Sequence, residues 1–293
     1  MTIISERLNQ GTTLSFEFFT PKDTAGKDRL DQNIEHLMNF SPDFLSITYG
    51  AAGTGRARTI GWVEGLSTRY SVPIMPHLTC ISHTKSEINS LLDIYKLVGV
   101  ENLLCLRGDK PSDSSLTTTS DFTYASDLVT TVRHHSEFDI GVAVHTEGHP
   151  ESANAETDLL HQSAKVEAAD FAITQFFYES RHYEKFTEYL RKRDIRTPVL
   201  PGIMPATNLA SLQRMSNLAG IKVPPKLIKQ LQKADSSLKD RQEIAIETSV
   251  ELSEKLLALG APGIHIYTLN SGIVPGKISQ AIEPAIHSAQ DHN

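Results

Sequence analysis

The chain has 293 residues, of which 39% are hydrophobic and 22% are charged, a composition that excludes disordered and collagen-like proteins. Its formal net charge is −7, so it lacks the basic surplus with which proteins bind nucleic acids or anionic membranes. It has neither a signal-peptide pattern nor an apolar run of about 18 residues, and we expect no membrane partner. Its two cysteines, Cys80 and Cys105, lie in apolar runs, which is typical of a reducing compartment and predicts a cytoplasmic protein.

Eight short apolar runs recur along the chain, about 25 to 35 residues apart except for one longer gap before the last. Hydrophobic residues do not alternate with polar ones in these runs, which is typical of strands buried on both faces. The predicted strands are, in chain order, Leu14–Phe19, Phe44–Thr48, Pro73–Cys80, Leu103–Leu106, Ile140–Val144, Phe171–Phe176, Val199–Ile203 and Ile264–Leu269.

Segments with helical periodicity separate the strands. In one of them, a capping box formed by Thr84 and Glu87 precedes apolar residues spaced i, i+3, i+4 and i+7. This stripe consists of Ile88, Leu91, Leu92 and Tyr95. Eight strands that alternate with helices predict a single-domain (β/α)8 TIM-type barrel over residues 1–293. A doubly wound open sheet is the alternative, because the number of strands does not establish closure.

One polar stretch interrupts this alternation late in the chain. It runs from Lys222 to Lys239 and opens with Pro224 and Pro225. No flexible Gly/Ser linker flanks it, so we expect a loop elaboration of the barrel and not a domain boundary.

Polar side chains follow seven of the eight predicted strands. In a barrel the carboxyl ends of the strands meet at one mouth, where functional groups gather. We therefore expect a lined pocket there, formed by Glu17, Thr48–Tyr49, His77–Cys80, Arg107–Asp109, His145–His149, Thr174–Phe176 and Tyr267–Asn270.

Glu17 is the most informative candidate for a catalytic residue, because it lies between Phe16 and Phe18 in the first strand. Partial desolvation would raise the pKa of this carboxyl, at about 1.4 kcal/mol per pH unit. A modest rise would suit a general acid that works near neutral pH. The alternative is a glutamate that forms an ion pair with a basic residue at the rim, for example Arg107, and the pattern alone does not choose between them.

The polar ends of the fourth and fifth strands also allow two interpretations each. Gly108 would let a ligand approach the backbone beside Arg107 and Asp109, or the three residues form an ordinary turn closed by an Arg–Asp pair. His145 and His149, with Glu147 between them, suggest a metal site or side chains that contact a ligand. Gly148 and Pro150 argue against a helix there, which favours the ligand contact over the metal.

The helix that follows presents Asp158, His161 and Lys165 on one face, at spacing i, i+3 and i+7. Such residues are usually solvated on a helix surface, and this is the interpretation that the pattern alone favours.

Nine short motifs follow one another over nearly the whole chain. They are SFEFFTP at Ser15–Pro21, ITYGA at Ile47–Ala51, PHLTC at Pro76–Cys80, LRGD at Leu106–Asp109, YASDLV at Tyr124–Val129, EGHPE at Glu147–Glu151, ITQFF at Ile173–Phe177, PGIMP at Pro201–Pro205 and YTLN at Tyr267–Asn270. Together, in this order and spacing, they resemble the methylenetetrahydrofolate reductase family of the bacterial single-domain type.

The resemblance implies a barrel with non-covalently bound FAD. Such enzymes reduce 5,10-methylenetetrahydrofolate to 5-methyltetrahydrofolate by ping-pong hydride transfer, with NADH or NADPH as the reductant. It implies that Glu17 is the general acid that opens the imidazolidine ring of the folate. Asp109 would lie near both flavin and pterin and tune their charge, and Gln175 would contact the folate or the nicotinamide. These three residues are the implied catalytic and substrate-binding residues.

The resemblance also implies a set of flavin contacts. The positions that match are Thr48, Tyr49, Ala51, His77, Arg107, Gly108, Asp109, Tyr124, Ala125, His149, Asp158 and Lys165, and His145 and His161 stand at two further positions where this chain departs from the family. We expect no metal ion in the site.

The departures concentrate on the flavin and folate sides of the pocket. His145-Thr146 replaces a usual Tyr-Pro, His161 an Asn, and Ala164 an Arg. Without that Arg the diphosphate loses a fork-shaped donor, and Lys165 supplies only a point charge. On the folate side, Ser211 replaces a Gln, Met215 a Phe and Ser271 an Arg.

Two other functions remain open at this point. One is a paralogue of the same fold that reduces the folate without tightly bound flavin or serves another one-carbon pathway. The other is a non-catalytic protein that binds folate or nucleotide. In each case we expect small-molecule partners and a homo-oligomer, since the helical exteriors of barrels commonly associate.

Overall fold

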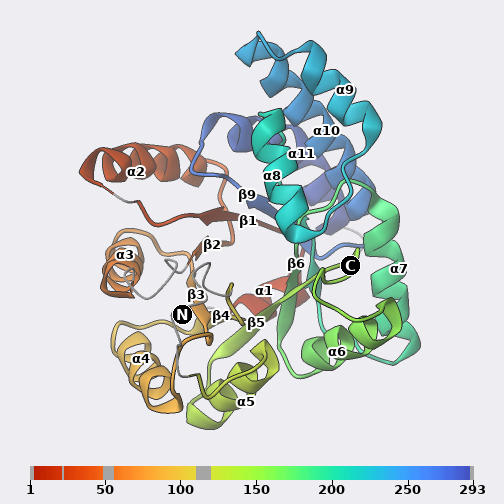
Figure 1. The fold of residues 1–293 in the computed structure, drawn as a ribbon. Helices are drawn as coiled ribbons and strands as arrows, with labels where there is room; N and C mark the ends of the chain where they lie inside the picture. The colour runs from red at the N-terminus through yellow and green to blue at the C-terminus, as the bar shows by residue number, and fades with distance from the viewer. Residues whose placement is uncertain (1–2, 22, 49–55, 110–119, 291–293) are drawn as a thin grey trace, which may run out of the picture.

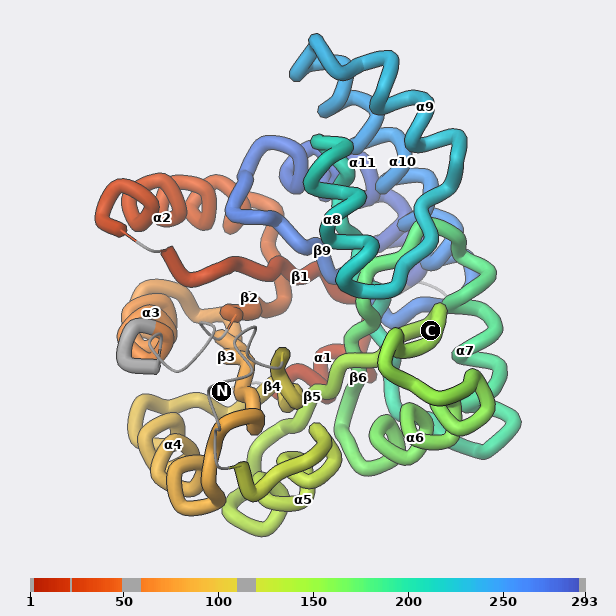
Figure 2. Tube along the Cα trace, viewed as in Figure 1, coloured from red at the N-terminus to blue at the C-terminus, as the bar shows by residue number. Residues whose placement is uncertain are grey.

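A ring of parallel strands surrounded by helices forms the centre of the molecule (Figures 1 and 2). The computed structural model describes residues 3–21, 23–48, 56–109 and 120–290. The strands in this part of the chain are β1 (Thr13–Phe18), β2 (Phe44–Ile47), β3 (Ile74–Thr79), β4 (Asn102–Leu106), β5 (Asp139–Val144), β6 (Phe171–Thr174), β7 (Val199–Leu200), β8 (Gly202–Ile203) and β9 (Gly263–Tyr267). All eight predicted runs are therefore strands, and the seventh is divided in two.

Pro201 divides that strand and shows how the sheet closes. The sheet order is β7-β6-β5-β4-β3-β2-β1-β9-β8, so its two end strands are consecutive in the chain. Val199 of β7 pairs with Ala172 of β6, and Gly202 of β8 pairs with His265 of β9. Proline has no N–H for the ladder, but its carbonyl accepts a hydrogen bond from the His265 N–H at 3.0 Å. The sheet thus returns on itself, which confirms the barrel and excludes the open sheet.

The helices surround this ring. They are α1 (Ile4–Gln10), α2 (Thr24–Met38), α3 (Arg56–Arg69), α4 (Lys85–Leu97), α5 (Ala125–His135), α6 (Ala155–Glu167), α7 (Ser180–Lys192), α8 (Leu209–Ala219), α9 (Pro225–Lys233), α10 (Leu238–Ala258) and α11 (Ile273–Gln290). The capping box of Thr84 and Glu87 is present at the start of α4. No helix in the described ranges combines the length and the apolar composition that crossing a bilayer requires.

The polar stretch before the last long helix is helical, so the loop expected there is wrong. Pro225 occupies the first turn of α9, where its missing N–H costs nothing. Leu227 and Leu231 follow one turn apart, and both are buried in an apolar cluster with Leu212 of α8. Two leucines among many polar residues were enough to build an amphipathic helix, which projects beyond the ring at the top of Figure 1.

Two apolar layers make up the core. Side chains alternate along each strand, so Phe16 and Phe18 point outward and lie in the cluster that includes Leu30 and Ile34 of α2. The inner layer joins residues of β2 to β4, β6 and β7 with Ile4 and Leu8 of α1.

Helix α1 closes the amino-terminal end of the barrel. The Ile4 N–H donates to Asn102 Oδ1 and the Ser5 N–H donates to Asp139 Oδ2, each at 2.8 Å. Figure 1 shows α1 behind the strands. Because this end is filled, the opposite end is the one at which a ligand can reach the interior.

Candidate active site

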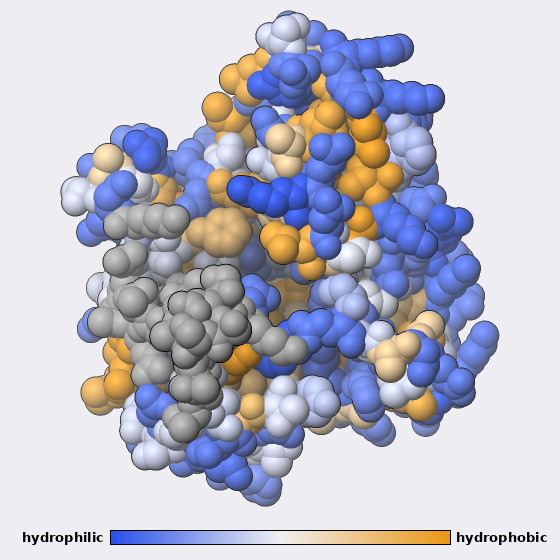
Figure 3. Space-filling model, in the orientation of Figure 1, coloured by the Kyte–Doolittle hydropathy of each residue, from blue (hydrophilic) through white to orange (hydrophobic). Residues whose placement is uncertain are grey.

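The carboxyl ends of the strands form the face seen in Figures 1 and 3. In the space-filling view, apolar residues gather near the centre of this face and over α8 to α10, and hydrophilic side chains cover most of its outer parts. Polar residues predicted from the strand ends lie in two groups on this face. One surrounds Glu17 inside the barrel, and the other lies where β4, β5 and α6 meet.

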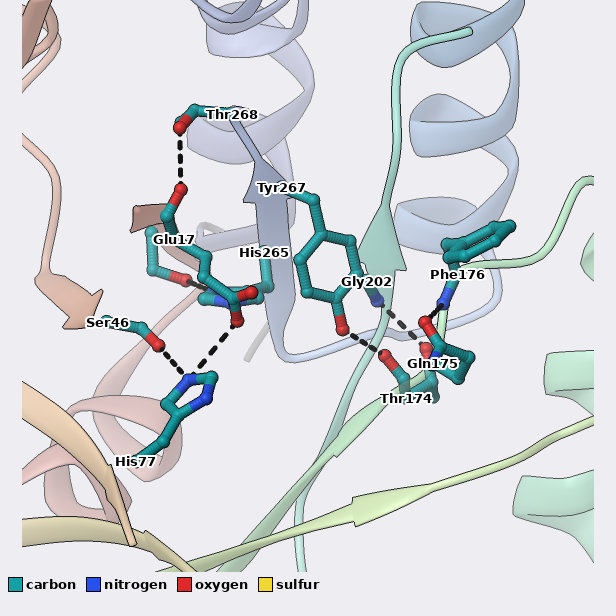
Figure 4. Close-up of polar contacts among 11 residues, drawn as sticks. Glu17, Ser46, His77, Thr174, Gln175, Phe176, Gly202, His265, Tyr267 and Thr268 are labelled. Carbon is teal, nitrogen blue, oxygen red and sulfur yellow. Dashed lines mark hydrogen bonds and ion pairs between the residues drawn. The ribbon is translucent and has the colours of Figure 1, made fainter. Parts of the chain in front are cut away.

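Glu17 lies inside the barrel between two imidazoles, as Figure 4 shows. Its side chain is 11% exposed, and its Oε2 is 3.3 Å from His77 Nε2 of β3 and 3.5 Å from His265 Nε2 of β9. Each histidine also contacts a serine hydroxyl at 2.7 Å, Ser46 Oγ for His77 and Ser15 Oγ for His265. The result is a continuous chain of polar contacts across four neighbouring strands, β9, β1, β2 and β3.

The surroundings of Glu17 differ from the aromatic ones expected from its sequence neighbours. Phe16 and Phe18 are fully buried, but on the other face of β1. Residues adjacent in a strand are not adjacent in space, and the side chains that face Glu17 come from β3 and β9.

The electrostatics of Glu17 change accordingly. Burial raises the pKa of the Glu17 carboxyl, but the positive charge of His77 and the hydrogen bonds from His265 and His77 outweigh burial and lower this pKa to about 2. The raised pKa expected from the sequence is therefore wrong. The ion pair with Arg107 that was the alternative is also wrong, since the basic partners of Glu17 are histidines.

The rest of this group joins the carboxyl ends of β6 and β9 to Gly202 of β8. The Tyr267 hydroxyl donates to the Thr174 carbonyl at 2.6 Å, and the Gly202 N–H donates to Thr174 Oγ1 at 2.9 Å. A Cβ on Gly202 would lie 2.5 Å from the Thr174 carbonyl oxygen, so only glycine fits. Gln175 Oε1 accepts from the Phe176 N–H at 3.0 Å, and the Gln175 amide nitrogen has no hydrogen-bond partner among the residues that the structure describes.

The second group is organised by Arg107 at the end of β4. Its guanidinium donates two hydrogen bonds to Glu151, both at 2.8 Å, so the turn closed by an Arg107–Asp109 pair is wrong. Asp109 is exposed. Gly108 has a φ of +86°, and a Cβ there would lie 2.8 Å from Ile81 Cγ2, which explains the glycine by backbone geometry without a ligand.

Asp158 on α6 is buried, which overturns its interpretation as a solvated surface residue. It is 4% exposed, and it accepts hydrogen bonds from the His149 N–H at 3.2 Å, Ser152 Oγ at 2.8 Å and Gln162 Nε2 at 2.6 Å. Gln162 also exchanges two hydrogen bonds with the backbone of His145. These contacts fix α6 against the loop after β5.

Lys165 and His161 of α6 differ in their surroundings. Burial lowers the pKa of the Lys165 ammonium to about 8, against the opposite influence of Asp158. His161 is exposed, so the predicted face of α6 is buried at Asp158, partly buried at Lys165 and solvated at His161.

His145 and His149 contact each other, with ring centroids 4.7 Å apart. Glu147 turns away from them. Its side chain is 5% exposed, accepts from the Lys222 N–H at 3.2 Å and lies 3.9 Å from His182 Nε2. No group of three or more His, Cys, Asp or Glu within the described ranges is arranged to hold a metal ion.

The remaining predicted flavin contacts are Thr48, Tyr124 and Ala125, which the structure describes, and Tyr49 and Ala51, which it does not. Thr48 directly follows β2 and its N–H donates to the Phe18 carbonyl at 2.9 Å. Tyr124 is 61% exposed just before Ala125, the first residue of α5. Tyr49 and Ala51 lie outside the described residues.

Sequence reasoning missed His265, Ser46 and Gln162. His265 and Tyr267 share the inward face of β9, and the alternation of that strand would have placed His265 beside Glu17 once the pairing of β1 with β9 was known. That pairing joins residues about 250 positions apart, and no local pattern indicates it.

Comparison with known proteins identifies the family. The profile of the methylenetetrahydrofolate reductase family matches residues 3–283. The 5,10-methylenetetrahydrofolate reductase of Escherichia coli (strain K12) is 33% identical over 258 residues, which cover 88% of this chain and 86% of that protein. The chain belongs to the methylenetetrahydrofolate reductase family. It is accordingly an oxidoreductase and not a non-catalytic binding protein.

Relatives from other kingdoms match a similar share of the chain. Methylenetetrahydrofolate reductase (NADH) 1 of Arabidopsis thaliana is 33% identical over 88% of this chain and 46% of its own length. Among solved structures, a protein of Clostridium thermocellum described as binding two copies of 5-methyl-5,6,7,8-tetrahydrofolic acid has a TM-score of 0.66 and 17% identity, covering 98% of this chain and 97% of that one. At 17% identity, this similarity shows only that the two proteins share a fold.

Proposed function

We propose that the protein reduces 5,10-methylenetetrahydrofolate to 5-methyltetrahydrofolate, with NADH or NADPH as the reductant and non-covalently bound FAD. The observation on which this rests is the position of Glu17, a buried carboxylate held by two histidines at the open end of a barrel of this family. The names of its relatives support the substrate, and one of them specifies NADH. A structural neighbour described as binding methyltetrahydrofolate supports a folate site in this fold.

The described residues offer a donor set that fits FAD. Arg107, His149 and Lys165 supply cationic or N–H groups near one another, and the buried His145 Nδ1 has no hydrogen-bond partner in the described part of the chain. The exposed ring of Tyr124 is available for stacking on a flat heterocycle. Bound there, the flavin would carry two electrons from the nicotinamide to the folate.

The residues that we propose to hold FAD come from the ends of β2, β3, β4 and β5 and from α5 and α6. They are Thr48, His77, Arg107, Gly108, Asp109, Tyr124, Ala125, His145, His149, Asp158, His161 and Lys165. Tyr49 and Ala51, outside the described residues, complete the proposal.

We propose that Glu17 delivers the proton that opens the imidazolidine ring of the folate. With a pKa of about 2, the Glu17 carboxyl is ionised at neutral pH in the free protein, so Glu17 needs a proton donor, and the neighbouring imidazoles of His77 and His265 are the groups that we propose for it. A folate that fills the mouth excludes water from Glu17 and so disfavours its charge. Glu17 Oε2 then takes the proton from the neighbouring Nε2 and passes it to the ring nitrogen, whose carbon–nitrogen bond breaks to leave an iminium that accepts hydride.

Two further residues assist in this proposal. The free amide nitrogen of Gln175 is a donor for a carbonyl or ring nitrogen of the folate or of the nicotinamide. Asp109, exposed at the end of the β4 loop, adds negative charge at the same mouth and would favour the iminium over the neutral ring.

Replacing Glu17 by Gln tests this function. In Glu17→Gln, anaerobic reduction of the flavin by NADH should proceed at the wild-type rate. Its reoxidation by methylenetetrahydrofolate should slow about 10²- to 10⁴-fold, the usual contribution of a general acid. Both half-reactions are followed by the flavin absorbance in a stopped-flow instrument.

Glu254→Gln, at an exposed glutamate of α10, is the matched control and should leave both half-reactions unchanged. Undiminished folate turnover in Glu17→Gln would show that Glu17 is not the acid.

A second candidate is a reductase of the same fold without tightly held flavin. Ala164 favours it, because this position of α6 offers no side-chain donor where the family usually has an Arg. The colour of the purified protein separates the two. Yellow protein that bleaches with NADH and recovers with the folate supports the first candidate, and colourless protein that still oxidises NADH with the folate supports the second.

A further inference from the structure

Four basic residues lie together where β4, β5 and α6 meet, and we refer to Arg107, His145, His149 and Lys165 as the basic cluster. The imidazoles of His145 and His149 are in contact, and Arg107 and Lys165 both act on the charge of each. Asp158 is the acidic group that acts on His145. These are the charged and titratable groups of β4, the β5–α6 loop and α6 that face His145.

The fixed charges of the basic cluster are already balanced. The Arg107 guanidinium forms a two-pronged pair with Glu151, both bonds at 2.8 Å. Asp158, held by three hydrogen bonds, offsets Lys165. With both histidines neutral, Arg107 and Lys165 face Glu151 and Asp158, and the charge of Asp109 also acts on Arg107. A phosphoryl anion that binds here therefore brings negative charge that no fixed group compensates.

His145 is the group able to compensate it. Its Nδ1 is buried and has no hydrogen-bond partner in the described ranges. His149 Nδ1, by contrast, already accepts the Glu151 N–H at 3.2 Å, so protonating it there would cost that bond. Burial, followed by His149 and Lys165, lowers the pKa of His145 to about 4, which leaves its ring neutral at neutral pH.

A bound anion would favour the protonated, charged form of His145. An opposite charge within about 4–6 Å shifts a pKa by about 1 to 3 units in favour of the charged form. A phosphoryl group beside the ring would thus raise the pKa of His145 towards neutrality. It would raise the pKa of Lys165 from about 8 in the same way.

We propose that binding of a phosphoryl anion to the basic cluster is coupled to uptake of a proton by His145, so that the affinity for FAD rises as the pH falls. This inference rests on the proposed flavin site and adds a regulation that follows from His145, where the family usually has a tyrosine. The sign follows from linkage, because a group whose pKa is higher in the complex takes up a proton between its two pKa values. Affinity is greatest below the free-state pKa of His145 and falls as the pH rises through the value in the complex. Loss of the Lys165 proton produces a second fall in the affinity for FAD above about pH 8.

The test measures protons together with binding. Flavin-stripped protein is titrated with FAD from pH 5 to pH 9 by quenching of flavin fluorescence. Calorimetry at pH 6 is carried out in two phosphate-free buffers that differ in their enthalpy of protonation. We expect net proton uptake at pH 6 and a dissociation constant that rises about tenfold between pH 5 and pH 7.

Variants and a second ligand locate the effect. His145→Phe and His145→Tyr, whose rings do not take up a proton, should abolish the uptake at pH 6, and Lys165→Met should remove the second fall above pH 8. His134→Phe, at an exposed histidine of α5, should behave as the wild type. Riboflavin, which has no phosphate, should bind without proton uptake.

The outcomes separate this inference from the function on which it rests. If FAD binds without proton uptake, or if both His145 variants keep the wild-type uptake, the coupling is wrong and the flavin site stands. If the wild type binds no FAD at any pH, the proposed flavin site is wrong and the coupling with it.

Discussion

Glu17 illustrates how much a single residue depends on what faces it across a barrel. Its carboxylate has about one tenth of its side-chain surface exposed, yet His77 and His265 keep it ionised. A buried carboxylate with such partners is stable only as a charged group, so it cannot store a proton by itself. The general-acid role that we propose for Glu17 therefore requires the imidazoles of His77 and His265 as the source of its proton.

The same electrostatics predict a contribution of Glu17 to stability that depends on pH. Its pKa is about 2 in the folded protein, against 4.5 for a glutamate in water. A carboxyl with a lowered pKa stabilises the fold above its unfolded pKa, and this contribution is lost as the pH falls through the folded value. At about 1.4 kcal/mol per unit, the free energy of unfolding of the wild type should lose about 3 kcal/mol relative to Glu17→Gln between pH 5 and pH 2.

Urea unfolding of both proteins at several pH values measures this difference. Glu254→Gln serves as the reference for a solvated glutamate. A gap between wild type and Glu17→Gln that stays constant over this range would mean that the histidines do not hold Glu17 in its ionised form.

At the scale of the residue, the sequence placed Glu17 and His77 at the mouth of the barrel but did not indicate His265 as the second partner of Glu17. Glu17, His77 and Gln175 were predicted at the mouth because polar side chains at strand ends are unusual enough to notice. His265 escaped because a histidine between two isoleucines looks like a core residue until the strand that faces it is known. The pKa of Glu17 was predicted in the wrong direction for the same reason.

At the scale of the element, periodicity identified every strand and misjudged one helix. Strands buried on both faces give continuous apolar runs, and these are difficult to mistake when they recur eight times. Helix α9 has only two fully or nearly fully buried residues, Leu227 and Leu231, among lysines and glutamines. Its apolar stripe is narrow because α9 packs on α8 and α10 at the edge of the molecule, and it does not cover the barrel itself.

The packing of α9 predicts a stability effect that a polar loop would not show. Leu231 is fully buried, so Leu231→Ala removes its contacts and leaves a cavity. Substitutions of this kind cost about 2–5 kcal/mol, and we expect a loss of that size in the free energy of unfolding by urea. Lys229→Ala, on the exposed side of the same helix, is the matched control and should change stability by less than about 0.5 kcal/mol. Equal small effects of the two substitutions would contradict the docking of α9.

At the scale of the whole molecule, the barrel has a filled end and a functional end. Helix α1 closes the first with Ile4 and Leu8, and the polar groups around Glu17 and Arg107 lie at the second. The order of the strands followed from the sequence, but closure did not, because it depends on how the chain passes Pro201 between β6 and β9. A proline in an apolar run reads as an interruption, and only the pairing on both sides shows that the strand continues.

This division predicts that stability and ligand binding can be altered separately. Ile4 is fully buried against the inner layer of the barrel, and Ile4→Ala should lower the free energy of unfolding by about 2–5 kcal/mol. The dissociation constant for FAD, measured by fluorescence quenching where the variant is fully folded, should stay within about twofold of the wild type, since the substitution lies at the end of the barrel opposite Arg107 and Lys165. Leu97→Ala, at a leucine of α4 that is 86% exposed, should change neither quantity. A large loss of FAD affinity in folded Ile4→Ala would show that the packing of α1 positions the strand ends at the mouth, and that the two ends of the barrel are mechanically coupled.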